Sequence, residues 1–199
     1  MPDYWNHNTA YHPWILRAVA ERPVRDALDV GCGDGLLLTR LAPLVDTAIG
    51  LEPDPGTYER ARVRLADVDN VTVRPCSFED WGAGAGSVDL VTMVASLHHM
   101  DLTGALEKTR ELLRPGGQLL VVGLAANRSA TDGLISGLQL PWVRLFSALH
   151  RESPDIGMPV AEAGESLAEI RAEAERVLPG VRVRRGLYYR YLLRWVKPG

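Results

Sequence analysis

Short apolar runs alternate with longer mixed segments over much of this 199-residue chain. The run ALDV (27–30) stops at a glycine, and TAIGL (47–51) stops at an acidic residue and a proline. Brief apolar runs bounded in this way are typical of buried strands. The segments after them, LLLTRLAPL (36–44) and TYERARVRLA (57–66), mix apolar and charged positions and predict helices.

The same alternation continues through the middle of the chain. We expect strands in VTVRPC (71–76), SVDLVTMVASL (87–97) and PGGQLLVVGLA (115–125), with a helix, TGALEKTRELLR (103–114), before the last. Strands that alternate with helices favour a parallel sheet that helices cover on both faces. Residues 26–123 are therefore predicted to form an α/β core.

The two ends of the chain and the segment after the core break this alternation. Residues 1–22 are polar and aromatic at first and then predict a helix that begins at a proline. Residues 124–158 are apolar but interrupted by glycine and proline, which indicates an insertion. Residues 159–199 predict a helix over 161–178 and then one or two strands. We see no linker between these parts and expect a single domain over the whole chain, residues 1–199.

The composition is that of an ordinary globular domain. It is 46% hydrophobic and 24% charged, with a net charge of −3, so no strong field points to nucleic acid or an anionic membrane as a partner. Two cysteines are too few for a disulfide scaffold and fit a reducing compartment. We find no signal peptide pattern and no apolar run long enough for a membrane span. We therefore expect a cytoplasmic protein with no integral membrane association.

Three glycines at alternate positions follow the first expected strand, in GCGDG (31–35). A dinucleotide fold needs G-x-G-x-x-G, and its third glycine would fall on Leu36. Asp34 also lies in this loop, where it would disfavour the pyrophosphate that a dinucleotide places at the helix N-terminus. The loop favours a ligand with a cationic or zwitterionic part, and an NAD-linked oxidoreductase on a similar fold is an alternative.

Glu52 comes at the end of the second expected strand. An acidic side chain in this place can accept hydrogen bonds from both hydroxyls of a ribose. Ribose recognition beside a loop that tolerates positive charge fits S-adenosylmethionine, which carries an adenosine ribose and a sulfonium with an amino-acid tail.

Five segments in order resemble the motifs of the class I S-adenosylmethionine-dependent methyltransferases, in particular the small-molecule branch called type 11 or type 25. They are LDVGCGDG (28–35), IGLEPDP (49–55), RPCSFEDW (74–81), VDLVTMVASLHHM (88–100) and ELLRPGGQLLVV (111–122). The resemblance covers residues 26–123. It implies a Rossmann-like three-layer sandwich with a mostly parallel seven-stranded sheet and an antiparallel C-terminal strand.

The resemblance also implies roles for individual residues. Asp29 and the glycine loop would hold the methionine part of the cofactor, and Glu52 would hold its ribose. Residues 53 and 77–79 would flank the adenine, and residues 94–96 would line the floor near the methyl group. The cofactor-binding residues expected in this way are Asp29, Gly31, Cys32, Gly33, Gly35, Glu52, Pro53, Ser77, Phe78, Glu79, Val94, Ala95, Ser96 and Tyr11.

The N-terminal segment has two interpretations. In related methyltransferases it often folds over the cofactor, and the residues that would then help to close the pocket are Tyr4, Asn6, Tyr11 and His12. Its aromatic residues also fit a staple that packs the N-terminus against the body.

Three histidines are candidates for a general base, His98, His99 and His12, because imidazole titrates near the operating pH. A capping or packing role is the alternative for the pair at 98 and 99. The spacing of the histidines matches no zinc signature, and no cysteine cluster joins them, so we expect no metal.

Trp142 and Phe146 in the expected insertion are candidates for substrate contacts, because this family places substrate-binding segments after the fifth strand. The apolar character of the insertion suggests a partly hydrophobic small substrate. A buried core, a dimer surface and a membrane surface are alternatives for such a segment.

The predicted activity is the transfer of a methyl group from S-adenosylmethionine to a small-molecule acceptor by in-line displacement. The alternative from another class is a methyltransferase-like protein that binds the cofactor, or has lost it, and acts through a partner. The acceptor atom, the acceptor itself and the oligomeric state stay open at this stage.

Overall fold

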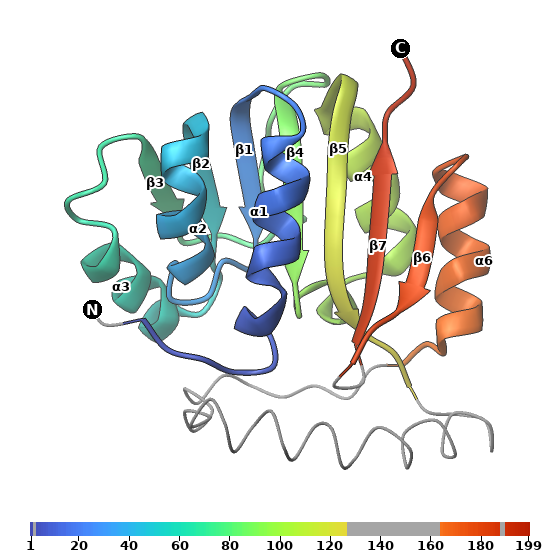
Figure 1. Ribbon diagram of the computed structural model, residues 1–199, viewed down its shortest axis with the longest axis horizontal. Helices are drawn as coiled ribbons and strands as arrows, with labels where there is room; N and C mark the ends of the chain where they lie inside the picture. Colours follow the sequence, from blue (N-terminus) through green and yellow to red (C-terminus); the bar gives the residue numbers. More distant parts are fainter. Residues whose placement is uncertain (2, 127–163, 188–189) are drawn as a thin grey trace.

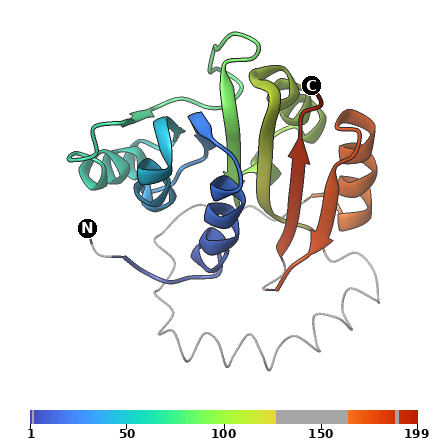
Figure 2. The same ribbon diagram turned by 45° about the horizontal axis from the view of Figure 1, so that its top comes forward.

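Seven strands form one sheet in the computed structural model, which describes residues 1, 3–126, 164–187 and 190–199 (Figure 1). The strands are β1 (Val24–Val30), β2 (Val45–Leu51), β3 (Val71–Arg74), β4 (Val88–Val94), β5 (Leu113–Leu124), β6 (Arg182–Arg185) and β7 (Arg190–Val196). Helices cover the sheet on both faces, which makes three layers (Figures 1 and 2).

The strand order is β3-β2-β1-β4-β5-β7-β6. The strands from β3 to β5 pair in parallel, and β7 is antiparallel to both of its neighbours, β5 and β6. The expected mostly parallel, seven-stranded sheet with an antiparallel C-terminal strand is therefore confirmed. The chain order reverses between β1 and β4, and ligands of open α/β sheets bind outside the carboxyl ends of the strands at such a point.

Two hydrophobic cores lie on opposite faces of the sheet. The helices are α1 (His12–Ala20), α2 (Leu36–Leu41), α3 (Pro55–Arg64), α4 (Leu102–Leu112) and α6 (Leu167–Val177), with 3-10 turns η1 (Thr9–Tyr11), η2 (Ala42–Leu44) and η3 (Leu97–His99). Leu120 of β5 packs in the core under α1 and α2, whereas Leu119 and Val121 pack in the core under α4 and α6. Because both faces of β5 are buried, its sequence is a continuous apolar run and not an alternating one.

The connection from β3 to β4, residues 75–87, contains no helix, unlike the connection before it. It crosses from the edge strand β3 to the central strand β4 as an irregular loop. Loops at the carboxyl edge of a parallel sheet commonly build ligand sites.

The C-terminal helix is shorter than the sequence pattern predicts. α6 begins at Leu167, because the Ser166 side chain accepts the N–H of Glu169 while the Glu169 carboxylate accepts the N–H of Ser166. This capping box is a helix start signal, so the predicted extension of the helix over 164–166 was wrong. The two final strands, β6 and β7, are present as expected.

Within the described residues, no helix combines the length and the apolarity that crossing a bilayer requires. Most of the expected insertion, including Trp142 and Phe146, lies outside the residues that the structure describes.

Candidate active site

The glycine loop leaves the end of β1 in a conformation that other residues rarely adopt. Gly31, Gly33 and Gly35 have φ angles of +68°, +59° and +82°, a region that favours glycine. A Cβ atom on Gly31 would stand 2.6 Å from the Cβ atom of Ser96. The backbone at Gly31 therefore passes directly against the end of β4.

Glu52 stands at the end of β2 and is only 5% exposed. Its Oε2 accepts the N–H of Gly33 at 3.0 Å, and its Oε1 accepts the N–H of Asp54 at 3.0 Å. Burial raises the pKa of Glu52, and the two backbone N–H groups act in the opposite direction. The carboxylate is thus held in one orientation, and each oxygen keeps a lone pair for a further donor.

Asp29 is a second buried acid, in β1. Its Oδ1 accepts the hydroxyl of Thr92 at 2.6 Å. Burial raises the pKa of Asp29 to about 7, the Thr92 hydrogen bond lowers it and the charge of Glu52 raises it further. A cation placed beside Asp29 would favour its ionised form.

Two cavities open at the carboxyl edge of the sheet and meet at Gly31. We call them the large cavity, of about 270 Å³, and the small cavity, of about 60 Å³. The large cavity is lined by Val30, Gly31, Leu51, Glu52, Pro53, Asp54, Cys76, Ser77, Phe78, Glu79, Ala95, Ser96, His99 and Met100. The small cavity is lined by Tyr4, Asn6, Asn8, Thr9, His12, Asp29, Gly31, Cys32, Gly33, Asp34, Leu36, Leu37 and Val94.

A lysine fixes the loop after β3 as the wall of the large cavity. Lys108 Nζ of α4 donates to the carbonyl oxygens of Phe78, Glu79 and Trp81 at 2.6, 3.0 and 2.7 Å. The same ammonium lies 5.1 Å from the centre of the Phe78 ring. The irregular loop therefore keeps a defined shape although no helix supports it.

The N-terminal segment forms part of the wall of the small cavity. We call residues 3–12 the strap, which runs along the carboxyl edge of the sheet before α1 (Figure 1). Its turn is stabilised by side chains, because Asn6 Oδ1 accepts the N–H groups of Asn8 and Thr9 at 3.0 and 2.9 Å. The Thr9 hydroxyl accepts the N–H of Asn6 at 2.8 Å in return.

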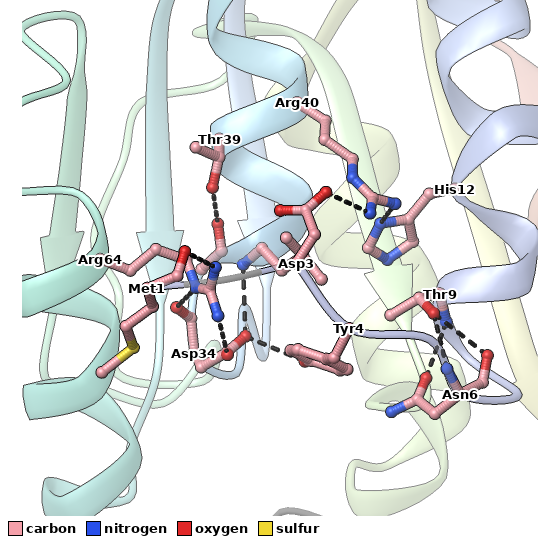
Figure 3. A network of polar contacts seen from close by, with 12 residues as sticks. Met1, Asp3, Tyr4, Asn6, Thr9, His12, Asp34, Thr39, Arg40 and Arg64 are labelled. Carbon is pink, nitrogen blue, oxygen red and sulfur yellow. Dashed lines mark hydrogen bonds and ion pairs between the residues drawn. The ribbon is translucent and has the colours of Figure 1, made fainter. Parts of the chain in front are cut away.

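Asp34 connects the strap to α3 (Figure 3). The Tyr4 hydroxyl donates to Asp34 Oδ1 at 3.0 Å, and Arg64 Nη2 donates to Asp34 Oδ2 at 2.8 Å. The side chains of Arg64 and Asp34 are 5% and 8% exposed. The expectation that Asp34 repels an anion was wrong, because Arg64 neutralises its charge inside the protein. The acids that disfavour an anion here are Asp29 and Glu52.

Arg40 of α2 makes a second connection to the strap (Figure 3). It pairs with Asp3 at 2.9 Å, and its Nη1 donates to His12 Nδ1 at 3.0 Å. A guanidinium can only donate, so Nδ1 of His12 is the acceptor and Nε2 carries the ring proton. Burial, and then the charge of Arg40, lower the pKa of His12 to about 3.

Comparisons with known proteins agree with this geometry. The family model of a methyltransferase domain matches residues 28–121. A protein of Mycobacterium bovis named as an uncharacterized methyltransferase is 32% identical over 203 residues, which cover 100% of both chains. This chain belongs to the methyltransferases.

Solved structures share the fold of the methyltransferase. An S-adenosylmethionine-dependent methyltransferase from Aquifex aeolicus is 16% identical with a TM-score of 0.63, and the match covers 93% of this chain and 88% of that one. A geranyl diphosphate methyltransferase, solved with GPP and sinefungin, is 16% identical with a TM-score of 0.66 over 95% of this chain and 78% of that one.

Most of the residues predicted to bind the cofactor line one of the two cavities. Those in the large cavity are Gly31, Glu52, Pro53, Ser77, Phe78, Glu79, Ala95 and Ser96. Those in the small cavity are Asp29, Gly31, Cys32, Gly33 and Val94.

Two predicted residues, Gly35 and Tyr11, lie outside both linings. Gly35 is the N-cap of α2, where its left-handed backbone lets the chain enter the helix. The Tyr11 hydroxyl donates to the carbonyl of Leu187 at 2.8 Å, so Tyr11 ties the start of α1 to the loop before β7. Tyr11 therefore makes a structural contact, and its contact with the cofactor stays a prediction.

The three candidate bases have different surroundings. Arg40 donates to the acceptor nitrogen of His12, and the lowered pKa of about 3 disfavours the predicted role of this histidine as a base. His99 lines the large cavity, and its ring centre lies 4.1 Å from that of His98. Burial, and then the charges of His99 and Arg190, lower the pKa of His98 to about 4. In the part of the chain that the structure describes, no three potential ligands come together as a metal site requires.

Several residues that line or support the cavities were not predicted from the sequence. Asn8, Thr9, Leu36 and Leu37 line the small cavity, and Cys76 and Met100 line the large one. Arg64 and Lys108 support the cavities from behind, but a basic residue on an amphipathic helix gives no sign in the sequence of what it contacts. The sequence held one signal for Asn8: it lies two positions after Asn6, which was already expected at the pocket.

Proposed function

We propose that this methyltransferase binds S-adenosylmethionine across both cavities and transfers its methyl group to a small organic acceptor. Adenosine occupies the large cavity and the methionine end occupies the small one. The observation that carries the proposal is the meeting of the two cavities at Gly31, with one buried acid, Glu52 or Asp29, beside each of them.

The large cavity suits an adenosine. Its apolar wall, which includes Leu51, Phe78 and Met100, can pack against a purine, and Glu79 can accept from the exocyclic amine. Both Glu52 oxygens are oriented by backbone N–H groups and can accept a ribose hydroxyl each.

The small cavity suits the amino-acid end. An ammonium group beside Asp29 would gain a buried ion pair, and Thr92 already orients that carboxylate. The positive φ of Gly31 and Gly33 lets backbone approach the ligand without a side chain in between.

The bound cofactor supplies a methyl group on a sulfonium, which leaves as a neutral thioether. The chain therefore has to position the acceptor and exclude water, and the strap does the latter over the small cavity. Ala95, at the junction of β4 with the site, has a φ of +54°. Such a backbone is strained for alanine, which is typical of positions where the surrounding structure fixes a functional geometry.

A general base is required only if the acceptor must lose a proton on transfer. His98 and His99 are the remaining candidates, and His99 is the one that borders a cavity. Replacement of the right histidine should lower turnover by about 100-fold. Unchanged turnover in both alanine variants would remove a histidine base from the mechanism.

Three further features of the proposal concern acceptor and location. The fold neighbour solved with GPP is named as a methyltransferase of a small organic molecule, geranyl diphosphate. The net charge of −3 gives no positive electrostatic potential that would attract nucleic acid. Cys32 and Cys76 are both free thiols, which fits a reducing cytoplasm. Cell fractionation tests the location directly.

The first experiment is a calorimetric titration with S-adenosylmethionine, S-adenosylhomocysteine and NADH. We expect the first two to bind, and Glu52→Ala to weaken both by at least about tenfold, since it removes two charged hydrogen bonds. Glu59→Ala is the matched control, because Glu59 is exposed on α3 and pairs only with Arg62 among the described residues.

Other results of this titration would favour the alternatives. Binding of NADH in place of the methyl donor would favour the oxidoreductase. Binding of S-adenosylhomocysteine without methyl transfer to any acceptor tried would favour the non-catalytic protein.

A further inference from the structure

Two strap residues that line the small cavity, Asn8 and His12, are each held by an arginine from the body of the protein. We propose that they form a carboxylate clamp, in which Asn8 Nδ2 and His12 Nε2 donate hydrogen bonds to the α-carboxylate of the cofactor. The clamp rests on the proposed function, which places the amino-acid end of the cofactor in the small cavity.

His12 presents a fixed donor. Arg40 donates to Nδ1 at 3.0 Å, so the proton of the neutral ring is on Nε2, at the edge turned away from Arg40 (Figure 3). His12 is only 4% exposed and lines the small cavity. Among the described residues none accepts a hydrogen bond from Nε2, so this N–H is available to a ligand in the cavity.

Asn8 presents a second fixed donor. Arg190 of β7 donates to Asn8 Oδ1 through Nε at 3.1 Å and through Nη2 at 2.8 Å. This contact assigns the oxygen of the amide and leaves the Nδ2 group without an acceptor among the residues that the structure describes. The backbone is fixed as well, because Asn8 N–H donates to Asn6 Oδ1 at 3.0 Å and Tyr11 N–H donates to the Asn8 carbonyl at 3.1 Å.

The charges around the small cavity match an amino acid in one orientation. Asp29 lies on the wall from the body and attracts an ammonium, whereas the two donors come from the strap. Neither lysine nor arginine lines the small cavity among the described residues. Positive charge reaches it indirectly, because Arg40 and Arg190 polarise His12 and Asn8 through hydrogen bonds, which strengthens the donors in a buried site.

The clamp also explains why arginines hold the strap from opposite sides of the site. Arg40 belongs to α2 and Arg190 to β7, so the strap is tied to both sides of the ligand site. Arg40 and Arg190 are positioning residues in this account, since neither lines the cavity. Asn8 and His12 make the contacts with the ligand.

The test compares two ligands that differ only in the carboxylate. S-adenosylhomocysteine and its decarboxylated analogue, which keeps the amine, are titrated into the full chain by calorimetry. In Asn8→Asp the oxygen facing Arg190 remains, but the donor becomes a second oxygen with negative charge. We expect S-adenosylhomocysteine to bind at least tenfold more weakly to Asn8→Asp, while the decarboxylated analogue binds as well as to the unmodified protein or better.

Arg17→Gln is the matched charge control, because it changes the net charge by the same unit on the exposed face of α1. It should bind both ligands as the unmodified protein does. If Asn8→Asp weakens both ligands equally, or neither, the clamp is wrong.

A second pair of variants tests His12. Asn at position 12 can keep an acceptor near Nδ1 but has no group that reaches the position of Nε2, whereas Gln places an amide N–H near Nε2. His12→Asn should bind S-adenosylhomocysteine about tenfold more weakly, with the decarboxylated analogue unaffected, and His12→Gln should retain most of the affinity, because a hydrogen bond to a charged group contributes more than one between neutral groups. Equal losses for both ligands in both variants would show a purely structural role.

The failure of the clamp is distinguishable from that of the proposed function. If neither ligand binds the unmodified protein, the cofactor site itself is wrong and the clamp falls with it. If both ligands bind the unmodified protein with equal affinity, the cofactor site stands and only the clamp is refuted.

Discussion

The large cavity and the small cavity hold their ligand-facing groups by different means. In the large cavity, Glu52 is oriented by backbone N–H groups of Gly33 and Asp54. In the small cavity, part of the wall is the strap, which is held by side chains far away in the sequence, such as Arg40 and Arg190. The large cavity is therefore a property of the sheet and its loops, and the small cavity is a property of how the N-terminus docks.

This difference predicts which substitutions affect which cavity. Changes at the shared glycine should disturb both. Changes in the arginine contacts should disturb the small cavity and leave the adenosine end in place, so a ligand without an amino-acid end reports on the large cavity alone.

The largest effect is expected at Gly31, where the two cavities meet. In Gly31→Ala the new Cβ would stand 2.6 Å from Ser96 Cβ, at a φ of +68°. We expect S-adenosylhomocysteine affinity to fall by at least about 100-fold, since strain of about 1–3 kcal/mol adds to a backbone displacement. Calorimetry measures this change.

Gly86→Ala is the control for strain alone, because Gly86 has a φ of +63° with no atom within 4 Å of the added Cβ. It should lower the free energy of unfolding by about 1 kcal/mol and leave ligand binding unchanged. Equal binding losses in the two variants would argue against a special role for the Gly31 contact.

The next effect is expected at the buried ion pair under the strap. Arg64→Met leaves Asp34 as a buried carboxylate without its cation and should lower the free energy of unfolding by about 3 kcal/mol. Arg62→Met, on the same helix, breaks a pair whose side chains are 60% and 56% exposed and should leave the free energy of unfolding nearly unchanged, because solvent screens exposed pairs. Urea denaturation of both variants decides the matter, and similar losses would contradict the proposed difference.

Asp29 is expected to give the small cavity a pH dependence of its own. Its pKa is about 7 in the free protein, and an ammonium ligand requires the ionised form. Affinity for S-adenosylhomocysteine should therefore fall as the pH drops from 7 to 5, by up to about tenfold per unit. Asp29→Asn should remove this dependence and bind weakly throughout, and a dependence that survives in the variant would exclude Asp29 as its source.

Asp29 should affect stability in the opposite direction. A folded-state pKa raised above its ordinary value contributes stability at low pH that is lost as the pH rises through about 7. Asp29→Asn should therefore stabilise the ligand-free protein relative to the unmodified chain at pH 8 and much less at pH 4. Thermal unfolding at the two pH values measures this difference.

The smallest effect is expected at the tyrosine contact of the strap. Tyr4→Phe removes the hydroxyl that donates to Asp34 at 3.0 Å and should cost about 1 kcal/mol, since Arg64 still neutralises the acid. Dissociation of S-adenosylhomocysteine should become a few-fold faster, measured by stopped flow. Tyr58→Phe is the control, because the Tyr58 hydroxyl makes no hydrogen bond with the described residues, and equal effects would exclude a role for the Tyr4 contact.

Much of the large cavity could be predicted from the sequence because its parts are local. Gly31 and Glu52 follow strands whose apolar runs are short and clearly bounded, so their place at the carboxyl edge follows from the strand order. Lys108 could not be predicted, since its three carbonyl partners lie in a loop that is distant in the sequence.

The roles of charged residues at the small cavity were harder to predict than their positions. Asp34 was placed in the loop correctly, but its ion pair with Arg64 removes the repulsion of an anionic ligand that its charge had suggested. Tyr11 and His12 were both expected at the cofactor, and only His12 lines the cavity. Neighbouring residues at the start of α1 point in different directions, and the Tyr11 side chain points to Leu187.

The sequence by itself determined the α/β core, the glycine turn and the acid after β2, because hydrophobic periodicity and glycine conformation act over a few neighbouring residues. Only the tertiary structure decided which charges are neutralised and which donors face the ligand. Those properties depend on arginines such as Arg40, Arg64 and Arg190, whose partners are brought near by folding and not by spacing along the chain.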